Sequence, residues 1–300
     1  MKVSVLISTY NGERYLKEQL KSLFLQTFKN IQIIVRDDFS NDATLGILSK
    51  FDVKLLNSDK NIGTNRSFSL LLKYALEYTD SQYFMFCDQD DIWDSTKVEN
   101  TLAQMQELES NYGDIPLLVH TDLVVVDEKL QIINNSFMKY QNLNGESNNF
   151  NELLVQNTIT GCTVMINRKL ALLANPIPCE AKMHDIWLGL VASKFGKIYY
   201  IPSTTIKYRQ HSKNTIGATS FNIKYIMAKV KSNNVLDQDI LQAEIFLKRY
   251  RKVLDKDSIE ILEEFISIKS KSFLEKRKIL LKYKLLKQGL IRNIGLLLKI

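Results

Sequence analysis

The sequence predicts an α/β fold in which helices cover both faces of a parallel sheet. In residues 1–110, short apolar runs rich in β-branched side chains alternate with stretches of helical spacing. Strands that alternate with helices imply parallel pairing in a sheet buried on both sides. Polar clusters follow the predicted strands, and such sheets bind ligands at the carboxyl ends of their strands. We therefore expect a ligand crevice at that edge.

The predicted elements follow one another in a regular order. The strands are expected at Val3–Ile7, Ile31–Val35, Val53–Leu56 and Tyr83–Cys87. Helices are expected over Leu16–Phe24, Ala43–Ser49 and Phe68–Leu76, and a further helix is expected to open at the capping box Thr96-Lys97-Val98-Glu99. The polar clusters at the strand ends are Ser8-Thr9-Tyr10, Asp37-Asp38, Asn61 and Asp88–Asp91.

Composition limits the class of protein. The chain has 300 residues, of which 45% are hydrophobic and 24% charged, as in a globular protein of one or two domains. Cys87, Cys162 and Cys179 lack the spacing of metal ligands, which predicts reduced thiols. The start of the chain does not resemble a signal peptide, and no apolar run is long enough to cross a bilayer. We expect a cytoplasmic protein, soluble or peripheral at the inner face of the cell membrane.

The acidic cluster Asp88-Gln89-Asp90-Asp91 carries the first indication of chemistry. It follows the apolar run Tyr83–Phe86 directly, so its carboxylates stand at the end of a buried strand. Crowded carboxylates repel one another unless a cation or a proton lies among them. Mg²⁺ prefers oxygen ligands of this kind and shares them with substrate phosphates. The cluster therefore indicates an enzyme that handles phosphates, although a solvated loop is the structural alternative.

Three further segments, taken with this cluster, resemble a known family. They are Val5–Gly12, Gln26-Thr27-Phe28 and Val35–Thr44, in which Arg36-Asp37-Asp38 follows a strand. Together they resemble the opening of family 2 glycosyltransferases, nucleotide-sugar enzymes with the GT-A fold, and Asp88-Gln89-Asp90 is similar to their DxD motif. The resemblance covers about residues 1–215. It implies a Rossmann-like mixed sheet in a catalytic domain at 1–220, with a nucleotide-sugar half at about 1–115 and an acceptor half at about 116–220.

The resemblance assigns roles to single residues. It implies that Ser8, Thr9 and Tyr10 line the nucleotide pocket, and that Asp38 accepts hydrogen bonds from the base. Asp88 would lie near the ribose and the metal, and Asp90 would bind Mg²⁺ or Mn²⁺ at the diphosphate. A cation there offsets the charge that develops on the leaving nucleotide diphosphate. The other members of the implied nucleotide-sugar site are Asn61, Gln89 and Arg209.

A second set of residues is implied for the acceptor side. Asp185, in Met183–Leu188, matches the family's catalytic carboxylate and would act as general base. His184 stands where the family often has another acid, and this variant, like Val119-His120-Thr121-Asp122, resembles bacterial rhamnosyltransferase-like members. Thr160–Thr163 resembles the acceptor-side loop. The acceptor-side residues are therefore Gly161, Cys162, His184 and Trp187.

The segment Tyr208–Asn214 resembles the element that closes over the diphosphate. Arg209 and His211 occupy alternate positions of a predicted strand, so they share one face. Arg209 would then reach phosphate oxygens, and His211 would do the same or bind the metal.

Each of these sites has a structural alternative. Asp37, Asp38 and Asp42 have the residue type of turns and helix N-caps. His184 and Asp185 would also suit an ordinary helix N-terminus, where the dipole favours a carboxylate. His211 by itself is typical of surface or packing positions.

The C-terminal part, residues 221–300, differs in charge from the rest. It holds 18 Lys/Arg against 9 Asp/Glu, and its pattern is helical throughout. An apolar stripe runs through Ile279, Tyr283, Leu286, Leu290, Ile294 and Leu297. A basic amphipathic helix of this kind would lie on an anionic membrane, on the catalytic domain or on a second subunit of a homodimer. No nucleic-acid recognition motif is present, so we expect no nucleic-acid partner.

These observations predict a metal-dependent, inverting glycosyltransferase. The donor would be dTDP-rhamnose or a UDP-sugar, and the acceptor a glycan or a lipid-linked oligosaccharide of a surface polysaccharide. One alternative is a nucleotidyltransferase, which normally has a glycine-rich basic loop, whereas Ser8–Arg14 contains one glycine and one arginine. The other is a non-catalytic nucleotide-sugar-binding or membrane-scaffold protein. Specificity for the donor sugar, the acceptor and the linkage is expected in loops such as the asparagine-rich segment Asn134–Asn151, predicted to be irregular and exposed.

Overall fold

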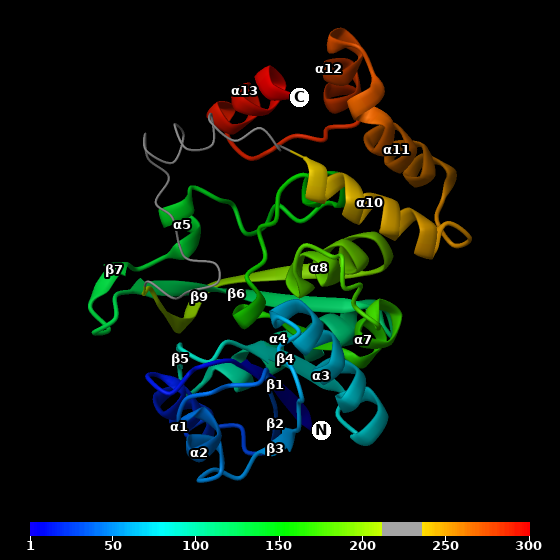
Figure 1. Ribbon diagram of the computed structural model, residues 1–300. Coiled ribbons are helices and arrows are strands. Elements are labelled where there is room, and N and C mark those ends of the chain that lie inside the picture. The colour runs from blue at the N-terminus through cyan, green and yellow to red at the C-terminus, as the bar shows by residue number, and fades with distance from the viewer. Residues whose placement is uncertain (212–235) are drawn as a thin grey trace.

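A single mixed sheet of nine strands forms the centre of the protein, whose computed structural model describes residues 1–211 and 236–300 (Figure 1). The strand order is β3-β2-β1-β4-β8-β6-β9-β5, and β7 pairs with β6. The strands are β1 Val3–Thr9, β2 Ile31–Asp37, β3 Lys54–Leu56, β4 Tyr83–Cys87, β5 Ile92–Trp93, β6 Leu117–Val126, β7 Ile132–Asn134, β8 Met165–Asn167 and β9 Lys197–Arg209.

Helices surround this sheet and extend beyond it at one end. Those of the first 211 residues are α1 Leu16–Phe24, α2 Thr44–Leu48, α3 Thr64–Tyr78, α4 Lys97–Tyr112, α5 Phe137–Gln141, α6 Phe150–Leu153, α7 Arg168–Ala174 and α8 His184–Phe195, with the 3₁₀ turn η1 Gly161–Thr163. The C-terminal ones are α10 Asp237–Tyr250, α11 Lys256–Ile266, α12 Phe273–Lys282 and α13 Leu290–Lys299, with the 3₁₀ turn η2 Ser267–Ser270. No described helix is both long and apolar enough to cross a membrane.

The first four strands confirm the predicted α/β order. β3, β2, β1 and β4 are parallel neighbours, whereas β8 runs antiparallel to both β4 and β6. The register sets Thr9 beside Asp37 and Ile7 beside Cys87, so the polar residues that follow these strands meet at one edge. The sheet is therefore mixed, as the resemblance implied.

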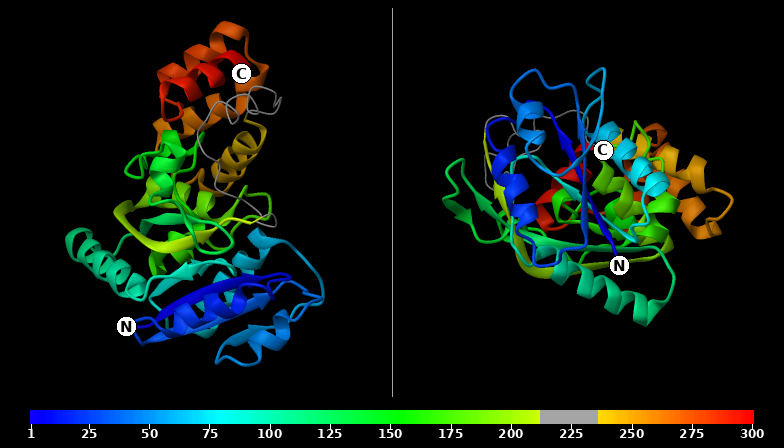
Figure 2. Two further views of the ribbon diagram at one scale, coloured as in Figure 1. Left: turned by 90° about the vertical axis from the view of Figure 1, so that its left-hand side faces the viewer. Right: turned by 90° about the horizontal axis from the view of Figure 1, so that it is seen from below.

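The two faces of the sheet are buried against different helices. Successive strand residues point to opposite faces, and Leu6 packs in a cluster with residues of α3 and α8, whereas Val5 and Ile7 pack with residues of α1 and α4. Because both faces are covered, these strands are continuous apolar runs rather than alternating ones. Figure 2 shows the helices on the two sides.

The start of α4 corrects one prediction. The helix begins at Lys97 as expected, but Thr96 and Glu99 form no capping box. The Thr96 hydroxyl instead donates to Asp94 at 2.9 Å, and the Glu99 carboxylate accepts a hydrogen bond from Thr27 at 2.6 Å. The motif failed because both side chains found partners outside the helix.

The C-terminal helices share a core with the part of the chain that forms the sheet. Phe246 of α10 lies against Phe150 and Trp187, with ring centroids 5.2 and 5.7 Å apart. Leu262 of α11, Leu280 of α12 and residues of α13 belong to the same buried cluster. Residues 236–300 therefore pack on the part of the chain that forms the sheet, while the predicted boundary at 220 lies outside the described residues.

The tail is not the continuous amphipathic helix that its stripe predicted. α12 ends at Lys282 and α13 begins at Leu290, and the turn between them contains Gly289 with a φ of 84°. The predicted stripe therefore divides: Ile279 is buried in the core, but Leu290 of α13 is 76% exposed.

The asparagine-rich segment is also more ordered than expected. It contains α5 and the start of α6, and Arg292 of α13 donates to the carbonyl of Asn142 at 2.8 Å. The tail therefore covers part of this segment, which local composition could not indicate.

Candidate active site

A cavity of about 380 Å³ lies at the carboxyl ends of β1, β2 and β4. Its lining consists of Ser8, Tyr10, Asp38, Asn61, Gly63, Thr64, Asp88, Gln89, Asp90, Thr160, Gly161, Met183, His184, Asp185 and Tyr208. Most residues predicted for the nucleotide-sugar site and for catalysis therefore meet here, although they come from distant parts of the chain. Four of the lining residues carry carboxylates.

Thr9 is a predicted pocket residue that the structure places elsewhere. Its side chain is buried, and its hydroxyl donates to Asp37 at 2.8 Å. Ser8 and Tyr10 reach the cavity lining, whereas Thr9, between them on an extended strand, faces the other way. Thr9 supports the turn after β2 rather than the cavity.

Asp37 and Asp42 confirm the structural alternative, since both hold turns. Asp37 accepts hydrogen bonds from the backbone N–H and the hydroxyl of Ser40 at 2.8 and 2.6 Å. Asp42 accepts from the backbone N–H groups of Thr44 and Glu13 at 2.9 and 3.1 Å. These two carboxylates are occupied by their neighbours and are absent from the cavity lining.

Asp38 is buried at the wall of the cavity and binds several donors at once. Its Oδ1 pairs with the Arg36 guanidinium at 2.5 Å and accepts from the Ile62 N–H at 2.8 Å, while Oδ2 accepts from the Gly63 N–H at 2.7 Å. These bonds fix the loop that leads into α3. Each carboxylate oxygen has two lone pairs, so Oδ2 can accept one more donor from a ligand.

Gln89 joins the acidic loop to the end of β1. Its side-chain amide accepts from the Tyr10 N–H at 2.9 Å and donates to the Tyr10 carbonyl at 3.0 Å. Gly12 leaves room for this contact, because a Cβ there would lie 2.4 Å from the Gln89 Oε1. Although predicted to bind the nucleotide sugar, Gln89 uses both its amide groups on the backbone.

The carboxylates of Asp88 and Asp91 form a crowded group with the thiol of Cys162. One potential ligand atom from each residue lies within 4.8 Å of the others. Burial and the nearby charge of Asp90 raise the pKa of Asp88 to about 7, and the same causes raise the pKa of Asp91 well above its usual range. Among the described residues, the buried Asp91 Oδ2 has no hydrogen-bond partner. The two carboxylates of this group are oxygen ligands of the kind that a hard divalent cation prefers.

Cys162 was predicted on the acceptor side, but its side chain does not reach the cavity. The residue is buried in η1. Its thiol faces the acidic group instead, because η1 packs against β4 just before that strand ends.

Arg209 and His211 both reach the acidic loop from the end of β9. The His211 Nε2 lies 2.8 Å from the Asp90 Oδ2, and the Arg209 Nε donates to the Asp90 carbonyl at 2.9 Å. The Arg209 guanidinium also pairs with Glu18 at 2.5 Å. Neither residue lines the cavity. Although β9 ends at Arg209, both side chains contact Asp90. Ser212, Lys213 and Asn214 lie outside the described residues.

Asp185 stands in the first turn of α8 and is 8% exposed. Its Oδ2 accepts from Asn157 at 3.3 Å, and its Oδ1 accepts from the Ile186 N–H at 2.8 Å. Burial raises its pKa to about 6, and its charge in turn helps to raise the pKa of Asp88. A carboxylate with this pKa is ionised at neutral pH and remains basic enough to accept a proton.

Trp187 was predicted on the acceptor side, but it belongs to the core. The side chain is fully buried, and its indole N–H donates to the Ala174 carbonyl at 3.0 Å. Asp185 lies two residues away on the face of α8 that meets the cavity, whereas Trp187 faces α10. Tertiary packing by α10, which is remote in sequence, decided its position.

Lys97 is a residue near the site that the sequence did not identify. Its side chain is fully buried, and burial lowers its pKa to about 8. The ammonium lies 4.7 Å from the centre of the Trp93 ring and 3.4 Å from the Thr163 carbonyl. No local pattern distinguishes this lysine from a solvated one at a helix start.

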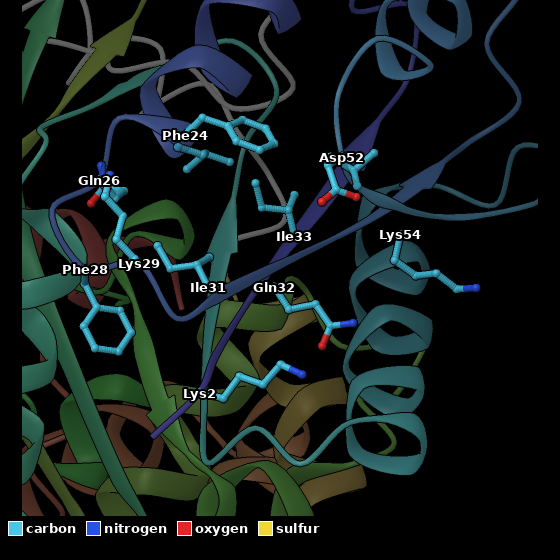
Figure 3. A pocket seen from close by; sticks show the side chains of 12 residues that line it. Lys2, Phe24, Gln26, Phe28, Lys29, Ile31, Gln32, Ile33, Asp52 and Lys54 are labelled. Carbon is cyan, nitrogen blue, oxygen red and sulfur yellow. The ribbon is translucent and has the colours of Figure 1, made fainter.

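A larger hollow of about 550 Å³ lies at the opposite end of the strands, near the start of β2 and β3 (Figure 3). Phe24, Phe28 and Lys54 are among the residues that line it, and Asp52 is its single carboxylate. Since the four carboxylates of the smaller cavity provide the groups for metal and proton chemistry, we take that cavity as the candidate active site.

Comparison with known proteins agrees with this geometry. The family model described as "Glycosyl transferase family 2" matches residues 4–172. The chain is 28% identical over 235 residues to the dTDP-rhamnosyl transferase RfbG of Shigella flexneri, covering 73% of this chain and 76% of that protein. It is also 28% identical over 228 residues to the UDP-Glc:alpha-D-GlcNAc-diphosphoundecaprenol beta-1,3-glucosyltransferase WfgD of Escherichia coli, covering 73% and 81%.

Solved structures share the fold. TarS 1–349 of S. aureus in complex with UDP-GlcNAc superposes with a TM-score of 0.53 at 17% identity, covering 94% of this chain and 79% of that one. A longer TarS structure gives 0.55 at 19% identity, and there the match covers 91% of this chain and 44% of that one. The mannosyltransferase PcManGT of Pyrobaculum calidifontis, in complex with GDP-Man and Mn²⁺, gives 0.51 at 13% identity, covering 95% and 80%.

Proposed function

The chain belongs to glycosyl transferase family 2 and is a glycosyltransferase, and from this premise we propose that it moves a sugar from a nucleotide diphosphate to an acceptor hydroxyl with inversion. The acceptor would be a glycan or a lipid-linked oligosaccharide in surface polysaccharide synthesis. The observation that carries this proposal is the separation of the cavity's carboxylates: Asp88 and Asp90 lie on one loop, while Asp185 stands at the start of α8.

The donor would lie along the carboxyl edge of the sheet. Ser8, Tyr10, Asp38 and Asn61 would bind the nucleoside, with Asp38 accepting a hydrogen bond from the base at its free lone pair. The names of RfbG and WfgD specify dTDP-rhamnosyl and UDP-glucosyl transfer, and TarS was solved with UDP-GlcNAc. We propose dTDP-rhamnose or a UDP-sugar as the donor.

We propose that Asp88, Asp90 and His211 would hold a Mg²⁺ or Mn²⁺ ion. Asp88 and Asp90 are half-buried on the same loop, Asp88 also belongs to the crowded group with Asp91 and Cys162, and the His211 Nε2 lies 2.8 Å from the Asp90 Oδ2. PcManGT was solved with Mn²⁺. When bound, such an ion offsets negative charge on the leaving diphosphate. His211 contacts Asp90, and Arg209 holds the same loop by its backbone, so both would keep the Asp90 carboxylate in place.

Asp185 would act as the general base. Its carboxylate would take the proton of the acceptor hydroxyl while that oxygen forms a bond to the anomeric carbon. The bond from the anomeric carbon to the diphosphate oxygen breaks at the same time, and its electron pair leaves with the nucleotide diphosphate. A single displacement of this kind inverts the anomeric configuration. Asn157 and the helix N-terminus orient the carboxylate.

The test compares Asp185→Asn with Asp90→Ala, using dTDP-rhamnose and UDP-glucose as donors, Mn²⁺ and a panel of acceptor glycans. We expect Asp185→Asn to bind dTDP or UDP as the wild type does but to lose about 10²- to 10⁴-fold in transfer rate. Asp90→Ala should instead weaken Mn²⁺-dependent nucleotide binding. Asp114→Asn, which alters an exposed carboxylate paired with Lys169, is the control and should change neither property.

Two outcomes would contradict the proposal. Wild-type protein that binds nucleotide diphosphate with Mn²⁺ yet transfers no sugar to any acceptor would favour a non-catalytic binding protein. If Asp90→Ala binds nucleotide as the wild type does, with the same dependence on Mn²⁺, then Asp90 is not a ligand of the proposed metal site.

The outer face of α13 is the part of the molecule that we propose would contact a membrane. Leu290, Ile294 and Leu298 lie at intervals of four residues and are 76%, 49% and 74% exposed. From Lys269 onward the chain has ten Lys/Arg and one acid, Glu275. Apolar side chains beside a basic surplus suit an anionic lipid surface, and a peripheral location would bring the enzyme to the lipid-linked acceptor named for WfgD.

A further inference from the structure

His184 is a buried polar side chain in the cavity wall that the mechanism above leaves unused. The residue is 4% exposed and lines the cavity beside Asp185. Neither of its ring nitrogens has a hydrogen-bond partner among the described residues. Buried polar groups are nearly always hydrogen-bonded, so an unpaired imidazole at the edge of a binding cavity indicates a ligand.

The ring of His184 is held in place from three sides. The centroids of the Phe68 and Phe86 rings lie 4.1 and 4.9 Å from its own. On the third side the ring faces the backbone of Gly161, where an added Cβ would lie 2.6 Å from the His184 Nε2. Glycine is therefore required at 161 for this ring position, and the imidazole presents its nitrogens in a fixed direction.

The chemistry of the imidazole selects the class of ligand. Burial lowers the pKa of His184 to about 3, so the ring is neutral and offers one N–H donor and one acceptor nitrogen. A neutral ring gives no charge attraction to a phosphate, and the carboxylate of Asp185, the next residue of α8, disfavours an anionic group at this position. A sugar hydroxyl both donates and accepts a hydrogen bond, and it would reach this position next to the proposed base.

We infer that His184 recognises a hydroxyl group of a neutral sugar ring through its uncharged imidazole, and so contributes to sugar specificity. The inference rests on the proposed function, since it assigns part of the same cavity. His184 is a specificity residue here, and Asp185 remains the base. The hydroxyl belongs either to the donor sugar or to the acceptor, and the experiment separates the two sources.

The experiment compares the wild type with His184→Leu, which removes both ring nitrogens at similar volume, and with His184→Gln, which keeps a donor and an acceptor. Affinities are measured for UDP, UDP-glucose, dTDP and dTDP-rhamnose with Mn²⁺, and KM is measured for the acceptor. His120→Gln is the matched control, because His120 is also buried but does not line the cavity. Melting temperature without ligand is recorded for every variant.

We expect His184→Leu to bind UDP and dTDP with the affinity of the wild type. Its affinity for the sugar-bearing donor, UDP-glucose or dTDP-rhamnose, should fall about tenfold. An unchanged donor affinity with a KM for the acceptor raised by about the same factor would place the hydroxyl on the acceptor. His184→Gln should recover part of the loss. Without ligand, His184→Leu should melt at or above the wild-type temperature, since an unpaired polar group has been removed.

The inference is overturned if His184→Leu changes neither donor affinity nor acceptor KM. It is also overturned if His184→Leu weakens the affinity for a nucleotide and for its sugar-bearing form by the same factor, whether the pair is UDP and UDP-glucose or dTDP and dTDP-rhamnose. A lower melting temperature in both His184→Leu and His184→Gln would overturn it as well. In either case the histidine would act structurally. A wild-type protein that binds none of these nucleotides contradicts the proposed function itself, which is a separate result.

Discussion

Asp37, Asp38 and Asp42 stand close together in the sequence, yet their carboxylates have different surroundings. Asp37 and Asp42 accept hydrogen bonds from their own turns, whereas Asp38 is buried at the cavity with Arg36 as its ion-pair partner. Asp88 and Asp185 also differ, because Asp90 lies beside the first and Asn157 beside the second. Environment rather than residue type therefore assigns each carboxylate its role.

The pH dependence of transfer provides a test at the scale of single residues. Because burial raises the pKa of Asp185 to about 6, the base is ionised at neutral pH and becomes protonated as the pH falls. We expect kcat/KM at saturating Mn²⁺ to be level above about pH 7 and to fall about tenfold per pH unit below pH 6. The measurement is a rate profile between pH 5 and 8.

His184→Gln serves as the control for this profile. The neutral His184 has a pKa of about 3, so replacing it should leave the acidic limb unchanged. If the limb disappears in this variant, the titrating group is the histidine and the assignment to Asp185 is wrong.

At the scale of elements, the ends of strands and helices position the site. The parallel register of β1, β2 and β4 brings their terminal residues to one edge, and α8 presents Asp185 from its first turn. The antiparallel strand β8 follows η1, so the loop that carries Gly161 comes to the same edge. A few local residues are enough to form each of these elements. The cavity forms only when packing places the elements next to one another.

The outer face of α13 gives a prediction at this scale. Full-length protein should sediment with vesicles that contain phosphatidylglycerol, less so with phosphatidylcholine alone, and less at high salt. The double variant Leu290→Ser/Leu298→Ser should bind the anionic vesicles several-fold more weakly, because it removes the exposed apolar side chains. Leu172→Ser on α7, where the leucine is also exposed, is the control and should bind normally.

A second copy of the chain is the alternative occupant of this face. Pairing two such tails would bring like charges together, since both carry the basic surplus. A dimer that forms without vesicles and dissociates in the double variant, with no vesicle binding by the wild type, would replace the membrane proposal with a homodimer interface.

At the scale of the whole molecule, the basic C-terminal region and the catalytic region are joined by one core. Figure 1 shows the C-terminal helices at one end and the first strands at the other, with α8 between them. Phe246 packs directly on Trp187 of α8. The metal-side residues and the proposed base are thus held by packing that extends into α10. We therefore expect residues 236–300 to unfold together with the catalytic part.

Phe246→Ala tests this shared core. Removing a fully buried ring should lower the free energy of unfolding by about 3 to 5 kcal/mol and shift a single urea transition for the whole protein. Phe273→Ala removes an exposed ring from α12 and should change that free energy by about 0.5 kcal/mol or less. Two separate transitions, with transfer activity surviving the first, would show that the C-terminal helices form an independent unit.

The sequence by itself determined the parallel order of the first strands, the position of the acidic loop and the family. These follow from local information: continuous apolar runs form buried strands, and polar residues follow directly where the runs end. The same local reasoning placed Ser8, Asp38 and Asp88 at the ends of strands, and the family resemblance added Asp185. All four line one cavity.

Only the tertiary structure decided which of the remaining side chains reach the cavity. Trp187 is buried because α10 packs on it, and Lys97 is buried although its neighbours suggest a solvated helix start. Asp90 meets His211 across a long stretch of chain, and Thr96 and Glu99 found partners other than each other. Periodicity specifies an element and its faces, whereas burial and pairing between distant residues depend on how the elements pack, and that is settled by the whole core at once.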